Sequence, residues 1–168
     1  MHQRGLTVGL GVQLYGFSNL QKAFDLVDKT NEDKRRQMER QWAKVTDLDF
    51  DLFNLSFGEF FSTDPDTFIA DINLAYAVMK EQAPSAEMTT VLHVGDDLRV
   101  DYNGENWIYY NLAQYADPEI TPWIHTVMFY NLYDNAGGAY HHDTFGEHRT
   151  ILEDRLERSE PVGYFPES

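Results

Sequence analysis

Segments of strand character and segments of helix character alternate along the whole chain, and this alternation most constrains the fold. Apolar, β-rich segments predict strands at residues 6–17, 50–60, 87–97, 121–132 and 162–166. Helical patterns predict helices between them at residues 18–28, 31–48, 64–84, 105–116 and 144–157. Strict alternation predicts right-handed crossovers and a parallel sheet, so the predicted fold class is α/β.

Local cues support individual elements of this pattern. Apolar and polar or small residues alternate over 53–57, as in a strand with one buried face. Asp64 followed by Pro65 predicts an N-cap and a first helical residue. Thr144 and Glu147 have the spacing of a capping box, which predicts the start of the last helix.

Two architectures accept five such strands. One is a flavodoxin-like doubly wound sheet with strand order 2-1-3-4-5. The other is part of a (β/α)8 barrel, which typically needs about 250 residues, whereas this chain has 168. No helix follows the last predicted strand, and the loops after the first, third and fourth strands are long, polar and aromatic. The sequence therefore favours a partial barrel, as one α/β domain over residues 1–168 that is incomplete at its C-terminus.

Composition narrows the classes of partner. The chain has 28 Asp and Glu against 13 Lys and Arg, a formal net charge of −15. Such a surface repels phosphate backbones and anionic lipids, which argues against nucleic acid and membranes as partners. A neutral or cationic ligand fits better, and a small molecule or a carbohydrate is the partner expected for this chain. The open edges of a partial barrel also predict self-association.

The absence of cysteine excludes disulfides, thiol nucleophiles and Cys-ligated metals. The sequence contains no run of 18 apolar residues and no signal-peptide pattern at its start. These observations leave the compartment open.

The ends of the predicted strands carry carboxylates, amides and aromatic rings with few basic residues. In either architecture, function gathers at the C-terminal ends of the strands. The tips "SFGEF", "HVGDD" and "YFPES" place Glu59, Asp97 and Glu167 there. Each carboxylate taken singly also fits a solvated loop charge or the start of a helix.

In presenting acidic residues at these tips, the chain resembles the glycoside hydrolase barrels, a resemblance of general architecture rather than of one long motif. It implies glycoside hydrolysis by paired carboxylates, one as acid and one as base or nucleophile. Glu167, Glu59 and Asp97 are then the acid/base candidates. Candidate substrate-binding residues are the rings of Tyr133, Trp107 and Tyr140, with Asn131 and His93. The alternative function is a non-catalytic, small-ligand-binding doubly wound module.

A further polar cluster, "YHHDTFGEH", contains metal-ligating residue types. His141, Asp143 and His148 are weak candidates for a metal site, because their spacing matches no common metal motif. Asp143 fits a helix cap equally well. The sequence shows no dinucleotide-binding or P-loop fingerprint, so no cofactor is expected.

Overall fold

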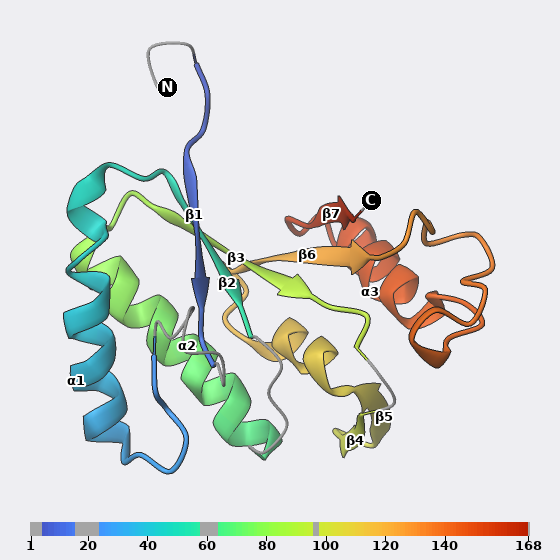
Figure 1. The fold of residues 1–168 in the computed structure, drawn as a ribbon, viewed down its shortest axis with the longest axis horizontal. Coiled ribbons are helices and arrows are strands. Elements are labelled where there is room, and N and C mark those ends of the chain that lie inside the picture. The colour runs from blue at the N-terminus through green and yellow to red at the C-terminus, as the bar shows by residue number, and fades with distance from the viewer. Residues whose placement is uncertain (1–4, 16–23, 58–63, 96–97, 168) are drawn as a thin grey trace. The chain divides into compact units, whose positions relative to one another are not determined.

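The structure is a computed structural model that describes residues 5–15, 24–57, 64–95 and 98–167 (Figure 1). Its internal contacts divide the chain into two compact units, residues 1–89 and 90–168. The boundary falls inside β3 (Glu87–Leu92), so this strand belongs in part to each unit. The two units are described in turn.

The first unit alternates strands and helices as the sequence predicts. The parallel strands β1 (Gly9–Gln13) and β2 (Leu52–Ser56) pair in register, with Leu10 opposite Phe53. Asp64 caps α2 by accepting a hydrogen bond from the Thr67 N–H, and Pro65 opens the helix, which confirms that helix start. The elements before β3 are β1 (Gly9–Gln13), α1 (Asn31–Trp42), the 3-10 helix η2 (Thr46–Leu48), β2 (Leu52–Ser56) and α2 (Pro65–Gln82).

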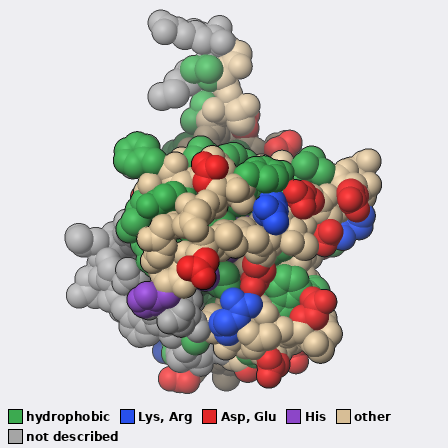
Figure 2. Space-filling view, turned by 90° about the vertical axis from the view of Figure 1, so that its right-hand side faces the viewer, with side chains coloured by type: hydrophobic (Ala, Val, Ile, Leu, Met, Phe, Trp, Pro, Cys, Tyr) green, Lys and Arg blue, Asp and Glu red, His purple; other side chains and the backbone are tan. Residues whose placement is uncertain are grey.

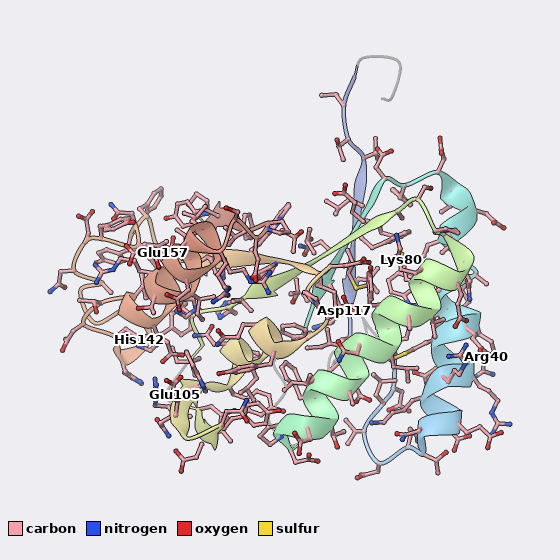
Figure 3. The ribbon with its side chains drawn as sticks, turned by 180° about the vertical axis from the view of Figure 1, so that it is seen from behind. Arg40, Lys80, Glu105, Asp117, His142 and Glu157 are labelled. Atoms are coloured by element: carbon pink, nitrogen blue, oxygen red, sulfur yellow. The ribbon has the colours of Figure 1, made fainter. Side chains whose placement is uncertain are left out.

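Helices α1 and α2 lie side by side (Figure 1) and enclose a charged group as well as an apolar core. The Trp42 ring packs edge-on against Phe53, with 5.1 Å between ring centroids. Lys34 of α1 donates to both carboxylate oxygens of Asp71 on α2 at 2.8 Å, and the Tyr15 hydroxyl donates to the same carboxylate at 2.6 Å. All three side chains are buried, so this unit contains a buried ion pair with a hydrogen-bonded hydroxyl. At the end of α2, Lys80 donates to the carbonyls that follow the helix (Figure 3).

The second unit holds the remaining strands and one long helix. The parallel strands β6 (Thr121–Thr126) and β7 (Gly163–Pro166) pair in a register that sets His125 beside Phe165. Helix α3 lies beside β6. The elements after β3 are β4 (Arg99–Tyr102), β5 (Glu105–Ile108), the 3-10 helix η3 (Tyr109–Tyr115), β6 (Thr121–Thr126), the 3-10 turn η4 (Ala139–His141), α3 (Gly146–Glu157) and β7 (Gly163–Pro166).

The five predicted strands are all present, as β1, β2, β3, β6 and β7, and they form a sheet in that order. The α/β fold class is thereby confirmed. A doubly wound sheet would need the first strand inside the sheet, whereas β1 stands at its edge, so that alternative is wrong. Sequential order is the order that part of a (β/α)8 barrel predicts. Over the described residues the sheet is open and not a closed barrel.

The predicted helix at 105–116 is wrong in its first turn. Residues 105–108 form β5, which pairs with β4 as an antiparallel hairpin, and only then does the 3-10 helix η3 begin. The cause is the turn at Asn103 and Gly104, whose φ angles are 52° and 83°. Asn-Gly favours this left-handed pair, and the hairpin it closes removes the following residues from any helix.

The predicted capping box is also wrong. Helix α3 begins at Gly146, and its cap residue, Phe145, makes no side-chain hydrogen bond. Glu147 instead accepts hydrogen bonds from Arg99, from the Ile108 N–H at 2.8 Å and from Asn111. These three donors, from the hairpin and η3, stabilise the Glu147 carboxylate more than the single backbone N–H of a capping box would.

Other element bounds differ from their predictions by several residues. The strand predicted at 121–132 ends at 126, and the helix predicted at 31–48 ends at 42. The start of the predicted helix at 18–28 lies outside the described residues, and residues 24–28 form no helix. None of the helices in the described part of the chain combines the length and apolar character that a membrane crossing requires.

Candidate active site

Three polar side chains lie at the C-terminal ends of successive strands in the second unit. His93 follows β3, His125 is the penultimate residue of β6, and Glu167 follows β7. The ladder between β6 and β7 continues past the strand ends, because the Glu167 N–H donates to the Thr126 carbonyl at 2.8 Å. Parallel pairing therefore brings these residues to one edge of the sheet. They are called the His–Glu cluster below.

The members of the His–Glu cluster touch one another. His125 Nε2 lies 3.2 Å from Glu167 Oε2, and the His93 and His125 rings lie 4.6 Å apart between centroids. Phe165, two residues before Glu167, stacks on the His125 ring at 5.2 Å with 20° between the ring planes. The His125 side chain is only 4% exposed, whereas that of Glu167 is 57% exposed. Glu167 is thus a solvent-accessible carboxylate whose Oε2 atom is in contact with the buried imidazole of His125.

The orientation of His93 is set by its own backbone. The Gly95 N–H donates to His93 Nδ1 at 2.9 Å, and the Tyr140 ring stands edge-on to the His93 ring at 5.7 Å. Gly95 has a φ of 49°, and a Cβ there would lie 3.1 Å from the Tyr110 ring. Only glycine fits both constraints without strain. The backbone of residues 93–95 therefore fixes the orientation of the His93 ring through the hydrogen bond to Nδ1.

Burial keeps both imidazoles neutral near pH 7. Burial lowers the pKa of His93 to about 4, helped by the neighbouring His125 and opposed by the charge of Glu167. Burial also lowers the pKa of His125, and the charge and hydrogen bond of Glu167 oppose this shift without cancelling it. A carboxylate only accepts hydrogen bonds, so neutral His125 carries its proton on Nε2. Neutral His93 likewise carries its proton on Nε2, because Nδ1 accepts from Gly95.

Two further histidines contact the backbone carbonyls of the segment that follows β3. His148 is buried in α3, and its Nε2 lies 3.2 Å from the His93 carbonyl. His142, which precedes α3 (Figure 3), places Nε2 3.1 Å from the Val94 carbonyl. Burial lowers the pKa of His148 to about 4. These two rings hold the backbone that carries His93.

The structure brings some of the predicted site residues together and leaves others elsewhere. Glu167, His93 and Tyr140 meet in or beside the His–Glu cluster. Glu59 and Asp97, the two predicted partners of Glu167, lie outside the described residues, so their pairing stays a prediction.

The remaining candidates have contacts of their own. Trp107, predicted to open a helix, lies in β5 and packs edge-on against Tyr115. The Arg149 guanidinium carbon lies over the Tyr133 ring, 5.5 Å from the centroid of the ring. The Asn131 side chain accepts from the N–H groups of the turn that follows it. A role for these residues in substrate binding stays a prediction.

Sequence reasoning missed His125, which completes the His–Glu cluster. The predicted strand ran to residue 132, so His125 was placed mid-strand rather than near a tip. A signal was present, since "WIHTV" sets one ionisable residue within an apolar strand.

No metal centre is assigned to the weak candidates. Among the residues that the structure describes, no group of three or more His, Asp or Glu side chains is arranged to hold a metal ion. His148 directs Nε2 at a backbone carbonyl rather than toward Asp143 or His141.

Comparison of the chain with protein-family models, curated proteins and solved structures found no match.

Proposed function

We propose that this chain carries a carbohydrate-active hydrolase site in which Glu167 is a catalytic carboxylate. The observation that supports this most is the His125–Glu167 contact, which orients an exposed carboxylate at the C-terminal edge of a sequentially ordered sheet. Active sites of (β/α)8 enzymes lie at that edge. The second carboxylate is proposed to be Glu59 or Asp97, the two partners predicted from the sequence.

The electrostatics suit glycoside hydrolysis. Its transition state develops positive charge on the sugar ring. The pKa values of His93 and His125 are lowered, so both rings are neutral and place no positive charge beside the Glu167 carboxylate. Figure 2 shows carboxylates spread over one face of the molecule with few basic groups, in line with the net charge of −15. A neutral sugar that becomes cationic is favoured in such surroundings.

We expect Glu167→Gln to lower kcat/KM by roughly 100-fold or more, because the amide cannot transfer a proton or attack the anomeric carbon. The measurement is nitrophenolate release from a panel of 4-nitrophenyl glycosides at pH 7. Glu157→Gln is the matched control, since Glu157 lies exposed at the end of α3 (Figure 3) and should leave the rate unchanged.

Two further variants identify the second carboxylate. Asp97→Asn or Glu59→Gln should show a loss like that of Glu167→Gln, and whichever does so is the partner. If wild-type protein hydrolyses none of the glycosides, or Glu167→Gln keeps the wild-type rate, the proposed function is wrong.

A further inference from the structure

An aromatic side chain stands almost fully exposed directly after β6. Phe129 is 84% exposed, more than any other large hydrophobic residue in the described part of the chain. It lies in a tight turn, because the Tyr130 N–H donates to the Val127 carbonyl at 3.1 Å. Exposing a whole phenyl ring forgoes the hydrophobic gain that burial would give. The position therefore calls for a reason other than packing.

The backbone of this turn is strained as well. Met128 and Phe129 have φ angles of 56° and 67°, the left-handed region that disfavours residues with a Cβ. Two successive left-handed residues are the central pair of a type I′ turn, where Asn and Gly are favoured. Met and Phe here cost free energy that Asn and Gly would not. Strain of this kind persists where the surroundings impose it and is concentrated at functional sites.

The turn is attached to the His–Glu cluster. The Phe129 N–H donates to the backbone carbonyl of Glu167 at 3.3 Å, while the Glu167 N–H donates to Thr126 at the end of β6. One backbone bond thus joins Phe129 to Glu167, and the other joins Glu167 to the last residue of β6. The segment that carries Phe129 therefore lies next to the backbone of Glu167.

The same connection between β6 and α3 contains a second strained aromatic residue. Tyr140 and His141 have φ angles of 50° and 64°, and the Tyr140 ring contacts His93. Two of the three left-handed pairs in this loop, the third being Gly137 and Gly138, therefore include an aromatic residue linked to the His–Glu cluster. Flat apolar rings suit the C–H faces of sugar rings, and a phenyl group carries no charge that would oppose a cationic transition state.

We infer that Phe129 is a substrate-contacting residue, a platform on which one sugar ring of a neutral polysaccharide stacks beside the ring attacked at Glu167. This inference rests on the proposed function and adds to it a chain-like substrate that extends past the bond to be cleaved. The strain at Phe129 is then retained because the ring is needed where it stands.

The test is affinity gel electrophoresis of the full chain in native gels that contain hydroxyethyl cellulose, galactomannan, soluble xylan or soluble starch. At least one polysaccharide should retard wild-type protein. Phe129→Asn should weaken that retardation about tenfold in apparent Kd and leave the Tm equal or higher, because Asn tolerates the left-handed backbone. Phe129→Trp should keep the affinity. Leu156→Asn is the matched control, since Leu156 is 60% exposed on α3 and should not affect binding.

The outcomes separate this inference from the proposed function. Retardation that depends on Phe129, found without any hydrolysis, sustains the platform and refutes the hydrolase. Hydrolysis that depends on Glu167, with Phe129→Asn bound as tightly as wild type, refutes the platform and sustains the hydrolase. A Phe129→Asn variant that melts several degrees lower also counts against the platform, because it would show that the ring is held for structural reasons.

Discussion

Replacing Asp71 with asparagine is expected to lower the free energy of unfolding by about 3–5 kcal/mol, because it breaks a buried ion pair and leaves a charge behind. Lys34 donates to both Asp71 oxygens at 2.8 Å, and its side chain is 6% exposed against 3% for Asp71. The amide offers Lys34 one oxygen and no charge, and the Tyr15 hydroxyl loses part of its acceptor. Urea unfolding measures the loss.

A matched control lies on the same pair of helices. Arg35 of α1 and Glu81 of α2 form an ion pair at 2.6 Å, with the two side chains 41% and 53% exposed. Glu81→Gln should cost much less than Asp71→Asn, because solvent screens an exposed pair. The double variant Lys34→Met with Asp71→Leu should recover much of the Asp71→Asn loss. Equal, small losses for Asp71→Asn and Glu81→Gln would show that the buried pair contributes no more than the exposed one.

Acidification should destabilise the second unit through its buried histidines. The pKa of His148 is lowered from 6.5 to about 4 by burial. The unfolded chain therefore binds this proton first as the pH falls, so the stabilising contribution is complete above about pH 6.5 and is lost progressively down to about pH 4. A shift of this size corresponds to about 3 kcal/mol. His93, whose pKa is also lowered to about 4, acts in the same direction.

His148→Gln isolates this effect, because its amide N–H can still donate to the His93 carbonyl while the titration is removed. Unfolding free energies from urea melts at pH 7 and pH 4.5 are compared for the variant and the wild-type protein. The variant should lose about 2–3 kcal/mol less over this range. His141→Gln changes an exposed histidine, so its loss of unfolding free energy between pH 7 and pH 4.5 should equal that of the wild-type protein. Parallel curves for His148→Gln and the wild-type protein would contradict a buried, neutral His148.

The sequence by itself determined the elements whose causes are local. Asp64 and Pro65 start α2 because both act within one turn of the helix. The alternation over 53–57 predicts β2 because successive side chains of a strand point to opposite faces. The alternation of strands and helices likewise predicts the α/β class, and Glu167 was identified from its place after the last strand. Asn103-Gly104 was an equally local signal for a hairpin, but the apolar pattern after it was read as a helix.

The tertiary structure alone decided which side chains meet. His125 joins Glu167 only because β6 pairs with β7 in one register, and His93 joins them only because β3 ends at the same edge. Glu147 has the spacing of a capping residue, yet it binds donors far along the chain. A carboxylate binds whichever donors the fold brings within about 3 Å, and burial strengthens those bonds. Local sequence specifies backbone conformation, whereas these contacts depend on strand register, which no short segment of the chain encodes.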